Sequence, residues 1–193
     1  MTAPDLVAAL LPVIEALDSL GVRYYVGGSV ASSIHGVPRA SIDADVIAEL
    51  SAEHVAPLAA RLSAFFYLDE DRMRDAVERR LSFNVIHLAT MYKVDVFVSM
   101  GRPFDVEAGG RARLEALGES LEAPKARVAS PEDTLLAKLE WYRRGGESSE
   151  RQWSDILGLL RVRAGRLDLA YLTRWASALG VADLLERASR QAG

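Results

Sequence analysis

Aspartates alternate with apolar residues in two strand-like segments of this chain. The segment "SIDADVI" places Asp43 and Asp45 two positions apart, and "KVDVFV" places Asp95 between two valines. Side chains at positions i and i+2 of a strand point to the same face, roughly 6 to 7 Å apart. Each segment therefore predicts a strand with one apolar and one acidic face. Because burying an unpaired carboxylate is expensive, these acids require a counter-charge or water.

Two interpretations of the acids follow. In the plainer one, Asp43 and Asp45 lie on the wet side of an exposed strand and Asp95 pairs with an arginine. In the other, the carboxylates share divalent cations. Mg²⁺ prefers hard oxygen ligands, and it usually takes one or two carboxylates and leaves its other positions to water and phosphate oxygens.

A glycine pair upstream offers the phosphate side of such a site. Gly27 and Gly28 follow the strand-like "VRYYV", and glycines allow close approach to the backbone. Ser29 is expected to cap a short helix that ends at Gly36. The free N–H groups at the start of this helix would attract an anion.

The remaining pattern alternates helices and strands before becoming helical. Helices are expected over residues 6–20, 29–35, 51–63 and 70–79, and strands over 22–26, 41–50, 81–89 and 92–99, the last two as a hairpin. Residues 101–129 read as loops or edge elements, and four helices follow Ser130 and Pro131. The predicted fold class is α+β, with a small mixed sheet and flanking helices in residues 1–130 and a helical region in residues 131–193.

Composition limits the class of protein. The chain has 193 residues, half of them hydrophobic, no cysteine and a formal net charge of -4. This excludes disulfides and thiolate metal ligands and disfavours nonspecific nucleic-acid binding. Acidic residues interrupt the apolar pattern of the first twenty residues, so we expect neither a signal peptide nor a membrane span, and a cytoplasmic protein.

The order of these motifs resembles the nucleotidyltransferases of the DNA polymerase β-like superfamily. A glycine pair, a short helix, Asp-x-Asp on a strand and a third acid on a later strand occur in that order from Gly27 to Asp95. The combination is far more specific than any single piece of it.

Within the superfamily, the sequence looks most like the AbiEii-type group, which includes toxins of toxin-antitoxin systems. Arg39 and Ser41 match an arginine and a small hydroxyl residue before the acids, although threonine is more usual than serine. Lys138, Arg151 and Asp155 match a helix bearing lysine and a following helix bearing arginine and aspartate.

The resemblance implies an enzyme that moves a nucleoside monophosphate from a triphosphate to an acceptor hydroxyl. Two Mg²⁺ ions would be the cofactors, and the base of the triphosphate is left open. The implied roles are metal binding and catalysis for Asp43, Asp45 and Asp95, and nucleotide binding for Gly27, Gly28, Ser29, Arg39, Lys138 and Asp155. Two of these have plainer alternatives: Lys138 as a solvated surface lysine, and Asp155 as the partner of an arginine between helices.

Several acceptors and one different class remain open. The group implies a tRNA end or a protein side chain, with an antitoxin as a candidate partner; a small hydroxyl compound such as an antibiotic is the alternative. A tRNA acceptor needs a basic surface near the site, whereas a small compound needs an acidic or aromatic pocket. A non-catalytic module that binds nucleotide or a partner is the third reading.

The tryptophans are expected to pack in the core rather than to bind a base. Trp141, Trp153 and Trp175 all lie in apolar patterns of helical spacing.

Overall fold

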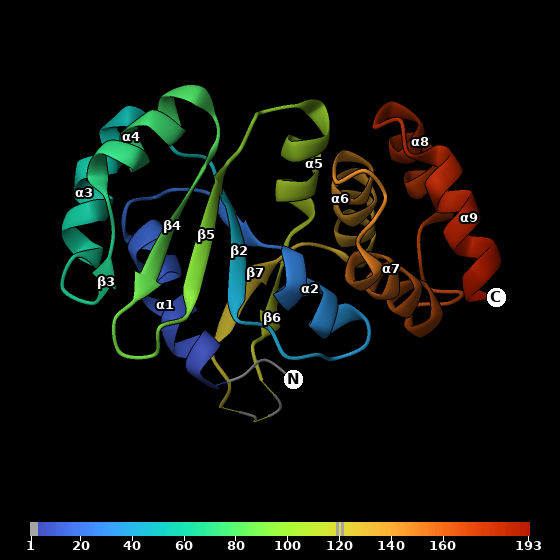
Figure 1. The fold of residues 1–193 in the computed structure, drawn as a ribbon, viewed down its shortest axis with the longest axis horizontal. Helices are drawn as coiled ribbons and strands as arrows, with labels where there is room; N and C mark the ends of the chain where they lie inside the picture. The colour runs from blue at the N-terminus through green and yellow to red at the C-terminus, as the bar shows by residue number, and fades with distance from the viewer. Residues whose placement is uncertain (1–3, 119, 121) are drawn as a thin grey trace.

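A mixed sheet forms the centre of the fold (Figure 1). In the computed structural model, which describes residues 4–118, 120 and 122–193, seven strands lie in the order β3-β4-β5-β2-β1-β7-β6. They are β1 (Tyr24–Val26), β2 (Asp43–Ala48), β3 (Phe66–Tyr67), β4 (Ser82–His87), β5 (Lys93–Val98), β6 (Arg113–Ala116) and β7 (Lys125–Val128). β2 pairs with β5 and β1 with β7 in parallel, and the other neighbours are antiparallel. The predicted α+β class with a mixed sheet is confirmed.

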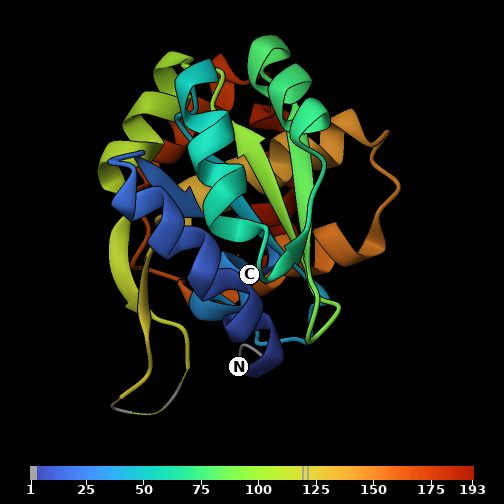
Figure 2. The ribbon, with the colours of Figure 1, turned by 90° about the vertical axis from the view of Figure 1, so that its left-hand side faces the viewer.

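Helices flank the sheet, and after the last strand the chain forms only helices and their connections. They are α1 (Pro4–Ser19), α2 (Gly28–His35), α3 (Ala52–Leu62), α4 (Glu70–Arg79), α5 (Pro103–Arg111), α6 (Pro131–Arg144), α7 (Glu150–Val162), α8 (Leu169–Ala178) and α9 (Ala182–Ala192). Figure 2 shows α1, α3 and α4 together on one face of the sheet. None of the helices in the described ranges has the length and apolar content needed to span a membrane.

Two hydrophobic cores hold these layers together. The first lies between the sheet and α1, α3 and α4, and it takes the alternate residues Ala44, Val46 and Ala48 from β2. The second is formed by α6 to α9 together with Phe104 and Ala108 of α5. Since β2 gives every second side chain to the first core, its other side chains, including Asp43 and Asp45, face the opposite side.

Most predicted elements are present, with one clear correction. The helix over residues 70–79 and the β4–β5 hairpin are confirmed. Residues 101–129, expected to be loops or edge elements, instead contain the helix α5 as well as the strand pair β6–β7 at the edge of the sheet. Pro103 is the first residue of α5, where its missing N–H has no helical partner to lose.

Candidate active site

The glycine pair brings the start of α2 against the acidic face of β2. Gly28 has a φ of +52°, and a Cβ placed there would lie 1.6 Å from Oδ2 of Asp45. The N–H of Gly27 donates to the backbone carbonyl of Asp45 at 2.9 Å. Only a residue without a side chain fits between this turn and the carboxylate.

Ser29 does not cap the helix as predicted. Gly27 occupies the cap position and α2 begins at Gly28. The hydroxyl of Ser29 is buried and donates to the backbone carbonyl of Asp43 at 3.2 Å. Its side chain therefore joins α2 to β2 instead of closing the helix end, because Ser29 lies inside the helix and not at the cap position.

The parallel pairing of β2 and β5 brings the acids together. Asp45 lies directly opposite Asp95, and Asp43 lies opposite Lys93. Burial, and after it the charges of Asp43 and Asp95, raise the pKa of Asp45 to about 6. The backbone N–H of Ser29 and the charge of Lys138 oppose this only in part. The site therefore holds more negative charge than its surroundings balance.

Two of the acids have hydrogen-bonding partners on the sheet face. The hydroxyl of Ser41 donates to Oδ1 of Asp43 at 2.8 Å, and Nζ of Lys93 lies 2.8 Å from Oδ2 of Asp95. The plainer interpretation gave Asp95 an arginine, but the partner is the lysine two residues earlier on the same strand. Asp43 and Asp45 line the adjoining cleft, whereas the carboxylate of Asp95 is engaged by Lys93.

Lys138, Asp155 and Arg39 form one buried ion cluster beside the acids. Nζ of Lys138 lies 2.8 Å from Oδ2 of Asp155, and Arg39 donates to both oxygens of the same carboxylate at 2.8 and 3.0 Å. Burial raises the pKa of Asp155, but the hydrogen bonds from Arg39 and Lys138 outweigh it and hold the pKa below its ordinary value. Lys138 is 8% exposed, so it is not a solvated surface lysine.

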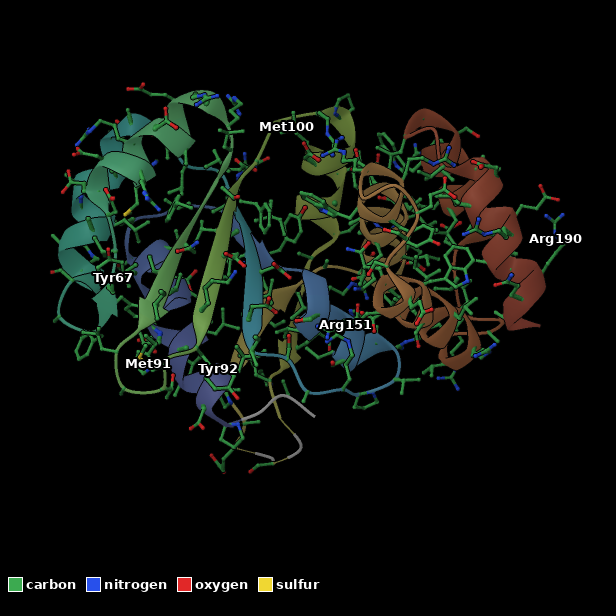
Figure 3. The ribbon with its side chains drawn as sticks, in the orientation of Figure 1. Tyr67, Met91, Tyr92, Met100, Arg151 and Arg190 are labelled. Carbon is green, nitrogen blue, oxygen red and sulfur yellow. The ribbon has the colours of Figure 1, made fainter. Side chains whose placement is uncertain are left out.

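These groups border a cleft between the open face of the sheet and the α6–α7 hairpin. Its volume is about 970 Å³, and it is lined by Gly28, Asp43, Asp45 and Lys138 among others. Met100 and Arg151, labelled in Figure 3, are both among the residues that line it. The structure thus brings Gly27, Gly28, Ser29, Arg39, Asp43, Asp45 and Lys138 to one cleft, with Asp95 and Asp155 directly behind its lining.

Several lining residues were not predicted. Phe97 follows Asp95 by two positions on β5, Trp141 follows Lys138 by three on α6, and Gln152 precedes Asp155 by three on α7. Strand and helix periodicity place each of them on the same face as a predicted residue, and this signal was available in the sequence. Among the described side chains, the buried oxygens Oγ1 of Thr134 and Oε1 of Gln152 have no hydrogen-bond partner, and both residues line the cleft.

The carboxylate oxygens at this site are of the chemical type that binds divalent cations. Asp43 and Asp45 offer hard carboxylate oxygens in a region with excess negative charge. Within the described ranges, no three His, Asp or Glu side chains are close enough together to form a ready-made metal site. In this structure the third carboxylate, that of Asp95, is paired with Lys93.

Comparison with known proteins places the fold. No protein-family model matches the sequence, and no curated protein matches it. Among solved structures, the antibiotic-resistance factor ANT(2″)-Ia superposes with a TM-score of 0.57 at 15% identity, over 96% of this chain and 97% of that one. A nucleotidyltransferase-like antigenic protein of Paracoccidioides brasiliensis gives 0.55 at 16% identity, over 98% and 94%. The chain has the nucleotidyltransferase fold.

One of these structures also includes a bound compound. ANT(2″)-Ia has been solved in complex with adenylyl-2″-tobramycin, and that structure superposes with a TM-score of 0.57 over 90% of this chain. At 15% identity the likeness concerns the fold alone. The resemblance to the polymerase β-like superfamily and the finer AbiEii-type resemblance both stay predictions.

Proposed function

We propose that this protein is a nucleotidyltransferase that moves a nucleoside monophosphate from a nucleoside triphosphate to an acceptor hydroxyl. The observation that carries the proposal is the contact between Gly28 and Asp45, where the backbone turn at the start of α2 lies so close to the carboxylate that a Cβ on residue 28 would overlap it. A helix start that can bind phosphate and an acid that can hold a metal are thereby brought to one point.

The chain's own groups would bind and align the reactants. The N–H groups after Gly28 and the ammonium of Lys138 would hold the triphosphate, and Arg39 and Asp155 would keep Lys138 in position. Asp95 would orient the acceptor hydroxyl and take its proton. The acceptor oxygen then bonds to the α-phosphorus as the bond to pyrophosphate breaks.

Magnesium is the cofactor that fits. Bound by Asp43 and Asp45, with Asp95 for a second ion, Mg²⁺ would supply charge neutralisation for the triphosphate and the leaving pyrophosphate. The crowded carboxylates support catalysis over a non-catalytic binding module, because a module without metal chemistry gains nothing from holding like charges together.

Two acceptor classes are proposed. A tRNA end or a protein side chain, with an antitoxin partner, rests on the AbiEii-type resemblance. A small hydroxyl compound is favoured by the lining of the cleft, which includes the aromatic residues Tyr25, Phe97 and Phe104. Aromatic and apolar walls are typical of small-molecule sites.

Labelled triphosphates test the activity and the acceptor together. The parent protein and Asp45→Asn are incubated with each α-labelled triphosphate, Mg²⁺, and either cell extract or a panel of hydroxylated antibiotics. Label on RNA or protein supports the toxin-like acceptor, and label on a small compound supports the second class. Equal labelling by Asp45→Asn would contradict the assigned role of the acid, and nucleotide binding without any labelling would favour the binding module.

A further inference from the structure

The α6–α7 hairpin presents side chains to the cleft in successive layers. Lys138 of α6 and Asp155 of α7 form the ionic layer, joined at 2.8 Å. One turn nearer the connection between the helices, Trp141 and Gln152 take the corresponding places, and both line the cleft. Residues three apart on a helix lie on the same side, so this second layer continues the first by about 5 Å.

Trp141 is not a core residue, contrary to the sequence-based expectation. It is 48% exposed, whereas Trp153 and Trp175 pack against the second hydrophobic core. Its ring meets Phe97 edge to face, with 5.7 Å between the ring centroids, and the guanidinium of Arg144 lies 5.6 Å from its ring centroid. An aromatic ring held in place at the edge of a cleft is a stacking surface for another flat ring.

Gln152 adds a polar group to the same layer. The oxygen Oε1 is buried and accepts no hydrogen bond from any described residue. A buried amide oxygen without a donor is unfavourable, so a donor from a ligand would be stabilised there. Nucleobases present N–H donors next to acceptors, which an amide can pair with.

We propose that Trp141 and Gln152 form the nucleobase subsite of the triphosphate. The base stacks on Trp141, and the amide of Gln152 reads its hydrogen-bonding edge. The inference rests on the proposed function, because Lys138 must hold the phosphates for the nucleoside to reach the next layer. The proposed subsite lies one helical turn beyond Lys138, toward the connection between α6 and α7.

Calorimetric titration separates the base from the phosphates. ATP, GTP, CTP, UTP and inorganic tripolyphosphate are titrated with Mg²⁺ into the parent, Trp141→Ala and Gln152→Leu. Trp141→Ala should weaken all four nucleotides about tenfold or more and leave tripolyphosphate unchanged. Gln152→Leu should weaken the preferred nucleotide about threefold to tenfold and narrow the differences among the four bases.

Gln191→Leu is the matched control. It removes the same amide from α9, where Gln191 accepts a hydrogen bond from Trp153 outside the cleft, and nucleotide affinity should not change. Trp141→Leu, which keeps an apolar side chain without a ring, replaces Trp141→Ala if that variant does not fold.

The outcomes distinguish the two proposals. If the parent binds triphosphates but the Trp141 variants bind them equally well, the nucleobase subsite is wrong while the proposed function stands. Equal weakening of tripolyphosphate would also overturn the subsite, because the effect would then act on phosphate. If the parent binds no triphosphate at all, the proposed function fails and the subsite fails with it.

Discussion

At the scale of single residues, the close contact between Gly28 and Asp45 restricts which residue each position can hold. Asp45 carries a charge that its neighbours do not balance, and Gly28 is the residue that lets the backbone come close to that charge. Changes at either position therefore act on the site more than on the rest of the fold.

Gly28→Ala should abolish most transfer activity. The new Cβ would collide with the carboxylate of Asp45, and a displacement of about 1 Å in a reacting group can lower the rate about 10²-fold. Gly21→Ala is the control, since Gly21 also has a positive φ, of +67°, but has no atom within 4 Å of an added Cβ. Gly21→Ala should lose about 1 kcal/mol of unfolding free energy and keep its activity. Similar activity losses in both variants would contradict a specific clash at Gly28.

Asp45→Asn should separate stability from activity. Removing one charge relieves the repulsion from Asp43 and Asp95, so the melting temperature at pH 7 should stay the same or rise. The rate of transfer should fall by about 10²-fold or more. An amide is a poor Mg²⁺ ligand, so the stabilisation that the ion would give to the charge of the transition state is lost. Thermal melts and single-turnover transfer measure the two effects. A variant that melts lower and stays active would mean that Asp45 has a structural role.

At the scale of elements, Asp155 ties three segments together. Its carboxylate joins α7 to Lys138 of α6 and to Arg39 in the loop after α2. The side chain of Asp155 is 7% exposed and that of Lys138 10%, so solvent screens this cluster little. The position of Lys138 in the cleft depends on this acid.

Acid should weaken the protein partly through Asp155. Because the folded state lowers the pKa of Asp155, its ion pairs stabilise fully above the ordinary Asp pKa of about 3.9 and are lost as the pH falls through the lower folded value. At pH 7, Asp155→Asn should lower the free energy of unfolding by about 3 kcal/mol, measured by urea unfolding. On further acidification, the free energy of unfolding of this variant should fall less than that of the parent.

Glu49→Gln is the comparison for this effect. Its partner Arg23 is 80% exposed, so breaking that pair should change the unfolding free energy by no more than about 1 kcal/mol. If the two variants differ little at pH 7, the Asp155 cluster has no special weight in stability.

Element prediction succeeded where one periodicity dominated. The alternation in β2 and β5 and the spacing in α4 come from local sequence, and the structure has these elements. The helix α5 was missed because Pro103 and the Gly109–Gly110 pair indicate a loop, while burial of Phe104 and Ala108 in a distant core favours the helix. Burial against residues far along the chain cannot be read from a local pattern.

In the predicted site, too, local motifs could be predicted from the sequence and distant side-chain contacts could not. The acids and the glycine pair follow from short motifs, and their meeting follows from parallel pairing of two strands. The pairing of Lys93 with Asp95, and of Arg39 with an acid 116 positions later, depends on side-chain packing that no motif specifies. The roles of these residues stay predictions.

At the scale of the whole molecule, α5 lies before residue 130 in the sequence but packs into the second core. Phe104 and Ala108 of α5 belong to the second core, and Arg111 at its end pairs with Glu132 and Asp133 at the start of α6. The division into residues 1–130 and 131–193 stays a prediction, and because α5 of the first part packs with the second, we propose that the two parts fold together.

Unfolding should accordingly show one transition. Trp153 and Trp175 pack against the second core and Trp141 lies on α6, so tryptophan fluorescence reports on the helical region, whereas circular dichroism reports on the whole chain. The two urea curves should coincide, and Phe104→Ala should move both to lower urea by the same amount. A fluorescence transition separate from the dichroism transition would show that the helical region is an independent domain.

The register between β2 and β5 has a consequence for how the site becomes ready. Six consecutive pairs align the two strands, so Asp45 and Asp95 cannot move apart without breaking backbone hydrogen bonds on both sides. The favourable energy of strand pairing thus holds the two like-charged carboxylates close together before any ligand binds. For the proposed metal site, the sheet therefore fixes the backbone positions of Asp45 and Asp95 in advance, and only their side chains are left to rearrange around a cation.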